Sequence, residues 1–392
     1  MSQLTSEASR EPSPDVAKAE QCDAAGQHTE AINHLVAGVR KNDVEAITRL
    51  GKRLLVGDRA PLRPNDAIGL LADASERGGA EAAARLAVLF GIGVSRRHDL
   101  ADALECLVVA AERGWPAAQA QLAVLAGERA GGRERTAEGE KTGGGDRVGA
   151  GAKAGVGAEA GAGVGGTRGA WRSLAASIDL SAWLAPPPGT ELSDSPLIRS
   201  FPNFLSAAVC RWLIERARPL LSRALVYEGV TKTTLAHPTR TNNAAMFNLL
   251  DTDFICVLME RRICRCLGVP FGHLEPPAVL HYAEGREITE HFDFVDPNVP
   301  DYDQEIARRG QRIVTFLVYL NDDYAGGETE FPRLDISHKG RAGEGLFFVN
   351  ALADGKSDLR TLHAGRPPRQ GEKWIVSQFV RNRPVLQLGA AH

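Results

Sequence analysis

Two histidines and one aspartate have the residue types and the spacing of a metal site. His291 and Asp293 stand two positions apart in a strand-like segment, and positions i and i+2 of a strand project to the same face. Their imidazole and carboxylate groups can therefore reach one point in space. His363 supplies a second imidazole. Two histidines and one carboxylate that leave the opposite coordination positions open are typical of non-haem iron(II) centres.

A lysine follows at a place where an anionic ligand would suit it. Lys373 stands ten residues after His363 and opens another strand-like segment. A buried ammonium group is costly unless it is paired. We expect the distal carboxylate of 2-oxoglutarate to be the partner of Lys373.

The segments around these residues predict the elements that must position them. Strand-like stretches bounded by glycine, proline, asparagine or aspartate follow two helical stretches. Helices first and strands afterwards predict an α+β domain, in which helices support an antiparallel jelly roll. The expected helices cover 204–221 and 251–267, and the expected strands cover 278–282, 312–320, 345–349 and 374–381.

The N-terminal part of the chain repeats with an offset of 36 residues, since Leu50–Gly57 matches Leu86–Gly93. Each unit carries two amphipathic helical patterns, and glycine stands where a helix C-cap is expected. This period predicts stacked helical hairpins that form a solenoid. Through the elements L-G-x-x-x-x-x-G and A-x-E-R-G, the repeat resembles the Sel1-like branch of the tetratricopeptide superfamily. We expect a surface that binds a peptide or a protein partner, with a spacer or dimerisation element as the alternative.

Glycine is concentrated between the two parts. Of the 41 glycines, 16 lie between Gly127 and Gly169, and a stretch so poor in large apolar side chains cannot offset its ordering entropy. The sequence therefore predicts a multidomain chain. Its parts are a disordered lead over 1–30, helical repeats over 31–126, a flexible linker over 127–189, the α+β domain over 190–385 and a tail over 386–392.

Charge and composition exclude several partners. Lysine and arginine number 46 against 49 acidic residues, a net charge of −3, whereas nucleic-acid-binding surfaces are usually clearly basic. No run reaches the roughly 18 apolar residues of a membrane span, and residues 1–30 lack a signal-peptide core. The six cysteines have no zinc spacing and suit a reducing compartment. We expect a cytoplasmic protein that binds neither nucleic acid nor membranes.

Residues 196–385 resemble the prolyl 4-hydroxylase family of Fe(II)- and 2-oxoglutarate-dependent dioxygenases. The resemblance implies a double-stranded β-helix in which His291, Asp293 and His363 hold the iron. The matching pieces occur in the family's order: Arg240-Thr241, Tyr282-x-x-Gly285, His291-x-Asp293, Tyr319-Leu-Asn321, Gly326-Gly-Glu-Thr-Glu-Phe-Pro332, His363-x-Gly365 and Gly371-x-Lys373-Trp374.

The resemblance also implies roles for further residues. Lys373 would pair with the C5 carboxylate of 2-oxoglutarate, Tyr319 would contact this cosubstrate, and Tyr282 would line the pocket. Arg240 and Thr241, which precede the barrel, would touch the substrate or brace the mouth of the site.

Two positions depart from the family pattern. Ile288 stands where tyrosine is common, and Phe379 stands where tryptophan is common. An acidic insert over 296–305 contributes to the 70-residue separation of Asp293 and His363. These departures leave the iron ligands intact and concern the choice of substrate.

The resemblance implies an enzyme that hydroxylates a side chain, first of all a prolyl residue of a peptide or protein. Fe(2+), 2-oxoglutarate and O2 would be the cofactor and cosubstrates, L-ascorbate the reductant, and succinate and CO2 the products. A free amino acid or another small metabolite is the alternative substrate. A partner-binding adaptor without turnover is a third interpretation, and the complete set of iron ligands together with Lys373 argues against it.

Overall fold

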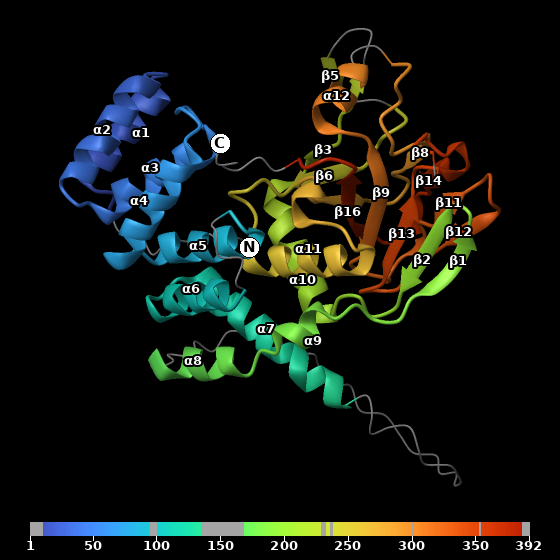
Figure 1. Ribbon diagram of the computed structural model, residues 1–392, viewed down its shortest axis with the longest axis horizontal. Coiled ribbons are helices and arrows are strands. Elements are labelled where there is room, and N and C mark those ends of the chain that lie inside the picture. Colours follow the sequence, from blue (N-terminus) through green and yellow to red (C-terminus); the bar gives the residue numbers. More distant parts are fainter. Residues whose placement is uncertain are drawn as a thin grey trace.

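The computed structural model describes residues 11–94, 100–134, 168–228, 233–235, 238–299, 302–352 and 354–385. An array of helices lies on one side of the molecule and a domain of sheets on the other (Figure 1). Between them lie α10 (Ala207–Ala217) and α11 (Phe254–Leu267) (Figure 1). Within the described part of the chain, no helix has both the length and the apolar character needed to cross a membrane.

Helical hairpins build the N-terminal part, and the predicted solenoid is confirmed. Gly57 and Gly93 stand one repeat apart and end α3 and α5 with left-handed φ angles of 71° and 85°, which glycine adopts without a Cβ clash. The 36-residue period recurs in the helix starts at 28, 64 and 100, and at 44, 80 and 116. The helices are α1 (Pro14–Ala24), α2 (His28–Arg40), α3 (Val44–Val56), α4 (Pro64–Glu76), α5 (Ala80–Ile92), α6 (Leu100–Glu112) and α7 (Pro116–Glu134).

The helical array begins earlier than expected. The predicted disordered lead over 1–30 is wrong for α1 and for the start of α2. Val16 and Ala19 of α1 are buried in one apolar cluster with Leu35 of α2. Only a narrow face of α1 is apolar, so its polar composition led to the wrong expectation. Residues 1–10 lie outside the described residues.

Part of the predicted linker over 127–189 is also folded, and the expectation of a flexible tether is wrong there. It contains the end of α7 together with α8 (Arg168–Ala176) and α9 (Leu180–Leu184). Trp171 is buried where α8 packs on α6 and α7, and Trp183 is buried where α9 packs on α11. The glycine-rich residues 135–167 lie outside the described residues.

Two antiparallel sheets form the C-terminal domain, and the predicted α+β jelly roll is confirmed. The major sheet has the order β1 (Thr190–Asp194), β2 (Leu197–Phe201), β13 (Gly345–Val349), β9 (Arg312–Tyr319), β16 (Lys373–Arg381), β7 (Ala278–Tyr282), β6 (Asn243–Met246) and β3 (Ser222–Arg223). The minor sheet has the order β12 (Ile336–His338), β11 (Thr329–Phe331), β14 (His363–Gly365) and β8 (Ile288–His291). The domain also contains two separate strand pairs and one helix: β10 (Ala325–Gly326) with β15 (Pro368–Gln370), β4 (Val226–Glu228) with β5 (Thr233–Leu235), and α12 (Tyr302–Arg309).

The two faces of the major sheet have different partners. In β9, Phe316 and Val318 join the core shared with α10 and α11, whereas Leu317 and Tyr319 join the core between the two sheets. This alternation follows because successive side chains of a strand point to opposite faces. From Thr315 onward, the odd-numbered positions of β9 therefore face the interior of the jelly roll.

The repeats pack directly on the helices behind the major sheet. Gly91 of α5 lies so close to α11 that a Cβ atom there would come within 2.8 Å of Val257 Cγ1. The side-chain oxygen of Gln121 in α7 accepts a hydrogen bond from the backbone N–H of Phe254 at 2.9 Å, and Arg261 Nε donates to the Gly91 carbonyl oxygen at 2.9 Å. One apolar core continues from the repeats through α10 and α11 to the major sheet. The repeats are thus fixed to the α+β domain.

Candidate metal centre

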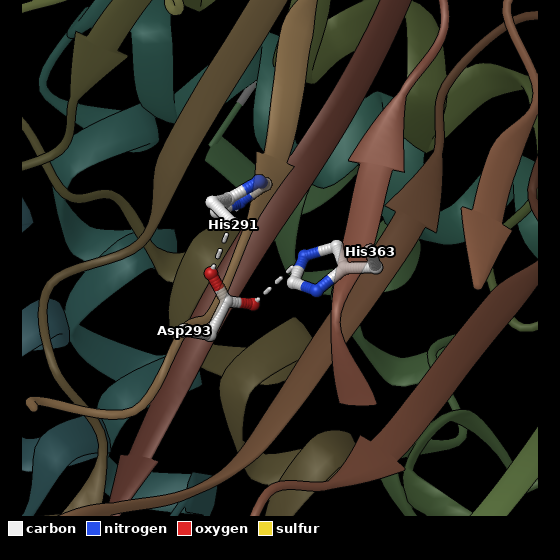
Figure 2. Close-up of side chains that lie close together, drawn as sticks. All are labelled: His291, Asp293 and His363. Carbon is white, nitrogen blue, oxygen red and sulfur yellow. Dashed lines mark ion pairs between the residues drawn. The ribbon is translucent and has the colours of Figure 1, made fainter. Parts of the chain in front are cut away.

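Three side chains converge between the two sheets (Figure 2). His291 ends β8, Asp293 follows two residues later, and His363 begins β14. The two histidines are direct cross-strand partners in the minor sheet. Strand pairing thereby brings the three predicted iron ligands together, although 70 residues separate Asp293 from His363.

The ligand atoms of these residues face one another. The Oδ1 atom of Asp293 lies 3.5 Å from Nε2 of His291, and its Oδ2 atom lies 3.4 Å from Nε2 of His363 (Figure 2). One ligand atom from each of the three residues can be chosen so that all lie within 4.8 Å of one another. Ligands about 2.1 Å from a shared metal ion stand roughly 3 Å apart, so a small rearrangement would close the three around a divalent ion.

The backbone sets the tautomer of both histidines. The Nδ1 atom of His291 lies 2.9 Å from the carbonyl oxygen of Thr289, and that of His363 lies 3.0 Å from the carbonyl oxygen of Thr361. A carbonyl oxygen can only accept, so each Nδ1 carries the proton. Each Nε2 therefore keeps its lone pair for a metal ion, which is the usual arrangement of metal-binding histidines.

Asp293 is held as a carboxylate by its surroundings. Burial raises the pKa of its carboxyl group, but the neighbouring imidazoles of His363 and His291 outweigh burial and hold this pKa well below its usual range. The hydroxyl group of Thr315 donates to Oδ2 of Asp293 at 2.8 Å, and the side-chain amide of Asn350 donates to that hydroxyl at 2.9 Å. Such outer partners orient metal ligands.

Sequence reasoning missed this pair of supporting side chains. Thr315 and Asn350 are fully buried, one in β9 and the other directly after β13. The signal available in the sequence was a polar residue, Thr315, between apolar neighbours in its strand. Its side chain lies on the face of β9 that points into the jelly roll. Only the register between strands shows that Asp293 lies opposite it.

Lys373 is buried without a carboxylate partner among the described residues. Its side chain is about 1% exposed, and its ammonium group donates to the carbonyl oxygen of Gly327 at 2.8 Å. Burial lowers the pKa of Lys373 to about 7. The ammonium nitrogen also lies 5.3 Å from the ring centre of Tyr282 and 5.5 Å from that of Tyr319. A buried cation in need of a negative partner fits a dicarboxylate such as 2-oxoglutarate.

A cavity of about 660 Å³ joins Lys373 to the three candidate ligands. Two of the other predicted site residues, Tyr282 and Arg240, also line it. Tyr282 is buried, and Arg240 is half-buried with its Nε atom lacking a hydrogen-bond partner in the described part of the chain. The cavity can therefore hold a cosubstrate between the lysine and the metal position, with room for a second molecule beside it.

The other two predicted site residues lie behind the cavity wall. The hydroxyl group of Tyr319 donates to Thr329 Oγ1 at 2.8 Å, and it is Thr329 that lines the cavity. The hydroxyl group of Thr241 accepts from the backbone N–H of Glu287 at 2.7 Å and donates to the Glu287 carbonyl oxygen at 3.1 Å. Thr241 therefore braces the segment before β8.

The positions that depart from the family pattern, Ile288 and Phe379, both line the cavity. The guanidinium carbon of Arg312 stands 3.8 Å above the ring centre of Phe379. Arg312 also forms a two-point ion pair with Glu275, with distances of 2.7 Å and 2.9 Å. Sequence reasoning missed this pair because its members lie 37 positions apart, and strand pairing rather than spacing brings them together.

Comparison with known proteins gives prolyl 4-hydroxylases among the relatives of this chain. The model of the 2OG-Fe(II) oxygenase superfamily matches residues 277–381, which include the three candidate ligands and Lys373. The chain is 31% identical over 214 residues to the probable prolyl 4-hydroxylase 9 of Arabidopsis thaliana, covering 49% of this chain and 71% of that protein. It is also 31% identical over 200 residues to the prolyl 4-hydroxylase subunit alpha-1 of Rattus norvegicus. That alignment covers 51% of this chain and 37% of the rat protein, so the chain spans little more than a third of this relative.

Solved structures of two prolyl hydroxylases are also similar to this chain. The viral collagen prolyl hydroxylase of Paramecium Bursaria Chlorella virus-1 matches with a TM-score of 0.37 and 26% identity, covering 47% of this chain and 95% of that one. The prolyl-4-hydroxylase of Pseudomonas putida matches with a TM-score of 0.34 and 19% identity, covering 47% of this chain and 92% of that one.

Proposed function

Because the chain belongs to the 2OG-Fe(II) oxygenase superfamily, we propose that it is a dioxygenase that hydroxylates a prolyl residue of a peptide or protein. Fe(2+), 2-oxoglutarate and O2 are the cofactor and cosubstrates that the family implies, and L-ascorbate is our proposed reductant. The names of the plant and rat relatives support prolyl hydroxylation. We also propose a reducing, cytoplasmic location, because none of Cys22, Cys106, Cys256, Cys264 and Cys266 forms a disulfide bond.

One observation carries the proposal: a buried lysine, which has no carboxylate partner among the described residues, shares a cavity with two histidines and an aspartate whose ligand atoms converge. The lysine would bind the distal carboxylate of 2-oxoglutarate, and the 2-oxo acid end of this molecule would lie in the same cavity as the candidate metal ligands. When bound, iron, 2-oxoglutarate and O2 supply the oxidation, in which one oxygen atom enters the substrate C–H bond and the other enters succinate, with release of CO2.

The chain's own residues orient these groups and keep water away. The carbonyl oxygens of Thr289 and Thr361 hold both imidazoles with Nε2 toward the metal position, and Thr315 holds Asp293. Tyr282 covers the lysine end of the cavity with its ring. Arg240 lies at the cavity wall, where its guanidinium group would contact the substrate. Positioning a C–H bond near the metal is the protein's main contribution in this class of reaction.

The repeats are fixed to the α+β domain, and this contact leaves only part of their surface available for binding a partner. The faces of α5 and α7 that meet α11 are already occupied. We propose that a protein partner, or a distant part of a polypeptide substrate, binds the remaining surface of the helical array. Because the two parts share one core, removal of residues 31–126 would expose apolar surface, so surface substitutions are the better test of recruitment.

The proposed substrate class is tested by a turnover assay with Fe(II), ascorbate and 2-oxoglutarate against a panel of proline-containing peptides. We expect succinate formation that depends on the peptide, together with a mass increase of one oxygen atom on proline. Turnover with free amino acids alone would move the proposal to a small-molecule substrate. Absence of turnover with any substrate, despite binding of iron and 2-oxoglutarate, would favour a non-catalytic adaptor.

A further inference from the structure

A cluster of two arginines and two glutamates, of which Arg381 and Glu275 are buried, lies at the end of the cavity opposite the lysine. Arg381 and Lys373 stand at the two ends of β16. The side chain of Arg381 has no exposed surface, and its Nε atom donates to Glu275 Oε1 at 2.5 Å. Its Nη1 atom donates to the carbonyl oxygen of Gly310 at 2.5 Å, and its Nη2 atom donates to the carboxylate of Glu305.

The positive charges of Arg312 and Arg381 are matched by the carboxylates of Glu275 and Glu305 together, and not by Glu275 alone. Glu275 is shared, because Arg312 contacts both of its carboxylate oxygens while Arg381 contacts one of them. The fully buried guanidinium group of Arg381 and the partly exposed one of Arg312 would thus divide a single carboxylate. Glu305 supplies the second negative charge, and an uncompensated buried charge is strongly destabilising. Because Arg381 is fully buried, solvent screens its ion pair with Glu305 less than it screens a pair between two exposed side chains.

Glu305 belongs to a helix that forms part of the cavity wall. Tyr302 and Glu305, both in α12, line the same cavity as the candidate metal ligands. The helix has no buried residue of its own, and it lies at the end of β9 (Figure 1). At its base, the side-chain amide of Gln311 accepts from the N–H of Val295 and donates to its carbonyl oxygen, both at 2.7 Å. This clamp holds the ends of the insert. The helix itself is held by Arg383, whose Nη1 atom donates to the carbonyl oxygen of Ala307 at 2.8 Å, and by the ion pair of Glu305 with Arg381.

We propose that Glu305 is a latch: its ion pair with Arg381 holds α12 over the cavity, where the helix forms a wall that positions the substrate. Glu305 touches neither the candidate metal ligands nor the lysine, so it is a positioning residue. Arg309, one helical turn further, lies 3.8 Å from Glu305 on the more exposed side and adds a weaker attraction. The claim that α12 positions the substrate rests on the proposed function, whereas the claim that Glu305 holds α12 in place does not.

The latch is tested by hydrogen–deuterium exchange of the full chain, with Glu305→Gln against the wild type. Glutamine keeps the size and removes the charge. The matched control is Asp303→Asn, which removes one charge from the exposed side of the same helix. We expect amide exchange across α12 to accelerate by about fivefold to tenfold in Glu305→Gln and to stay at the wild-type rate in the control. Equal exchange in both variants would overturn the latch.

The positioning role is tested by steady-state kinetics on the same variants. We expect the KM for a prolyl peptide to rise by about threefold to tenfold in Glu305→Gln, while the KM for 2-oxoglutarate stays within about twofold of the wild type. Glu305→Asp, which restores the charge with a shorter reach, should recover part of the loss. An unchanged peptide KM alongside faster exchange would overturn the positioning role.

The two proposals fail in different ways. A wild-type chain without turnover on prolyl peptides would refute the proposed substrate class. The exchange comparison needs no turnover, so it decides on the latch in either case.

Discussion

The helical array and the jelly roll of this chain use opposite ways of bringing residues together. In the array, α3, α5 and α7 begin at intervals of 36 residues, and each hairpin packs on its neighbours in sequence. In the jelly roll, His291 pairs directly with His363, and Thr315 of the major sheet reaches Asp293 near the minor sheet. Contacts of the first kind repeat along the chain, whereas contacts of the second kind exist only after the sheets have formed.

This difference teaches where chemistry can be built. A repeated helical hairpin presents the same kind of surface several times and suits packing or recognition. Two facing sheets can direct side chains from distant strands at one buried point, which a metal centre requires. We therefore expect changes in the jelly roll to alter cofactor binding and turnover, and changes in the array to alter stability and recognition.

The largest effect is expected from the candidate metal ligands. Replacement of His291 or Asp293 by alanine removes a ligand atom from the converging set. Substrate-dependent succinate formation should fall below about 1% of the wild type, beyond the roughly 10- to 100-fold loss typical of outer-sphere partners. A turnover assay and iron titration measure this. The control is His28→Ala in the helical array, and retained activity in either ligand variant would refute the ligand assignment.

The next effect is expected at the buried lysine. Lys373→Met keeps most of the side-chain volume and removes the charge, so the KM for 2-oxoglutarate should rise by roughly 30-fold or more. The fold should persist, because loss of an unpaired buried charge does not destabilise it. Lys339→Met is the matched control, since the Lys339 ammonium lies over the ring of Tyr324 and does not line the cavity. Equal KM values in both variants would place the cosubstrate elsewhere.

The same lysine predicts a pH dependence of cosubstrate binding. Burial lowers the pKa of Lys373 to about 7 in the ligand-free chain, whereas its ordinary value is 10.5. A bound carboxylate favours the charged form and raises this pKa, so above pH 7 binding must take up a proton. The Kd for 2-oxoglutarate should therefore increase with pH above about 7 and be flat below it. Calorimetry in two buffers of different ionisation enthalpy measures the proton uptake, which should vanish in Lys373→Met.

A smaller effect is expected from the support behind Asp293. Thr315→Val removes the hydroxyl group that donates to this carboxylate and leaves the amide of Asn350 without its acceptor. Iron affinity should fall by about 10- to 100-fold, because outer partners tune metal ligands to this extent. Thr315→Ser restores the hydroxyl group and should recover most of the affinity. Wild-type affinity in the valine variant would show that Asp293 is oriented without Thr315.

The smallest effect is expected at the contact between the two regions. Gln121→Ala leaves the buried N–H of Phe254 without its acceptor and should lower the free energy of unfolding by about 1–3 kcal/mol. Gln119→Ala, two positions earlier, removes a bond to Ala111 inside the array and is the matched control. Thermal unfolding measures both variants, and iron binding should be unchanged. A separate early transition of the array in the wild type would show that the two regions are not coupled.

Much of the fold could be predicted because its signals are local. The 36-residue period and the glycine C-caps predicted the helical array, and strand-like segments after two helices predicted the jelly roll. The predicted domain boundaries were wrong where they depended on amino-acid composition alone. Polar residues around Val16 and Ala19 suggested disorder over 1–30, and the glycine-rich stretch extended the expected linker over Trp171 and Trp183, which are buried. A narrow apolar face on a short helix leaves little trace in composition.

The residues with distinctive chemistry were visible in the sequence itself. The spacing of His291 and Asp293 and the position of Lys373 predicted an iron-type site, because the types and order of these residues are rare in combination. The sequence could not separate Arg240, which lines the cavity, from Thr241, which braces a backbone segment. Neighbouring residues in an extended segment point to opposite sides, and only the fold decides which side is the cavity.

The sequence by itself thus determined which side chains could bind a metal ion and an acidic cosubstrate. The tertiary structure decided how they are held: the pairing of His291 with His363, the threonine behind Asp293, the contact of the helical array with α11, and the attachment of α12 through Glu305. The physical reason is that a side chain's type and its local periodicity are written in consecutive residues. Register between strands and the balance of buried charges depend on residues that meet only when the chain has folded.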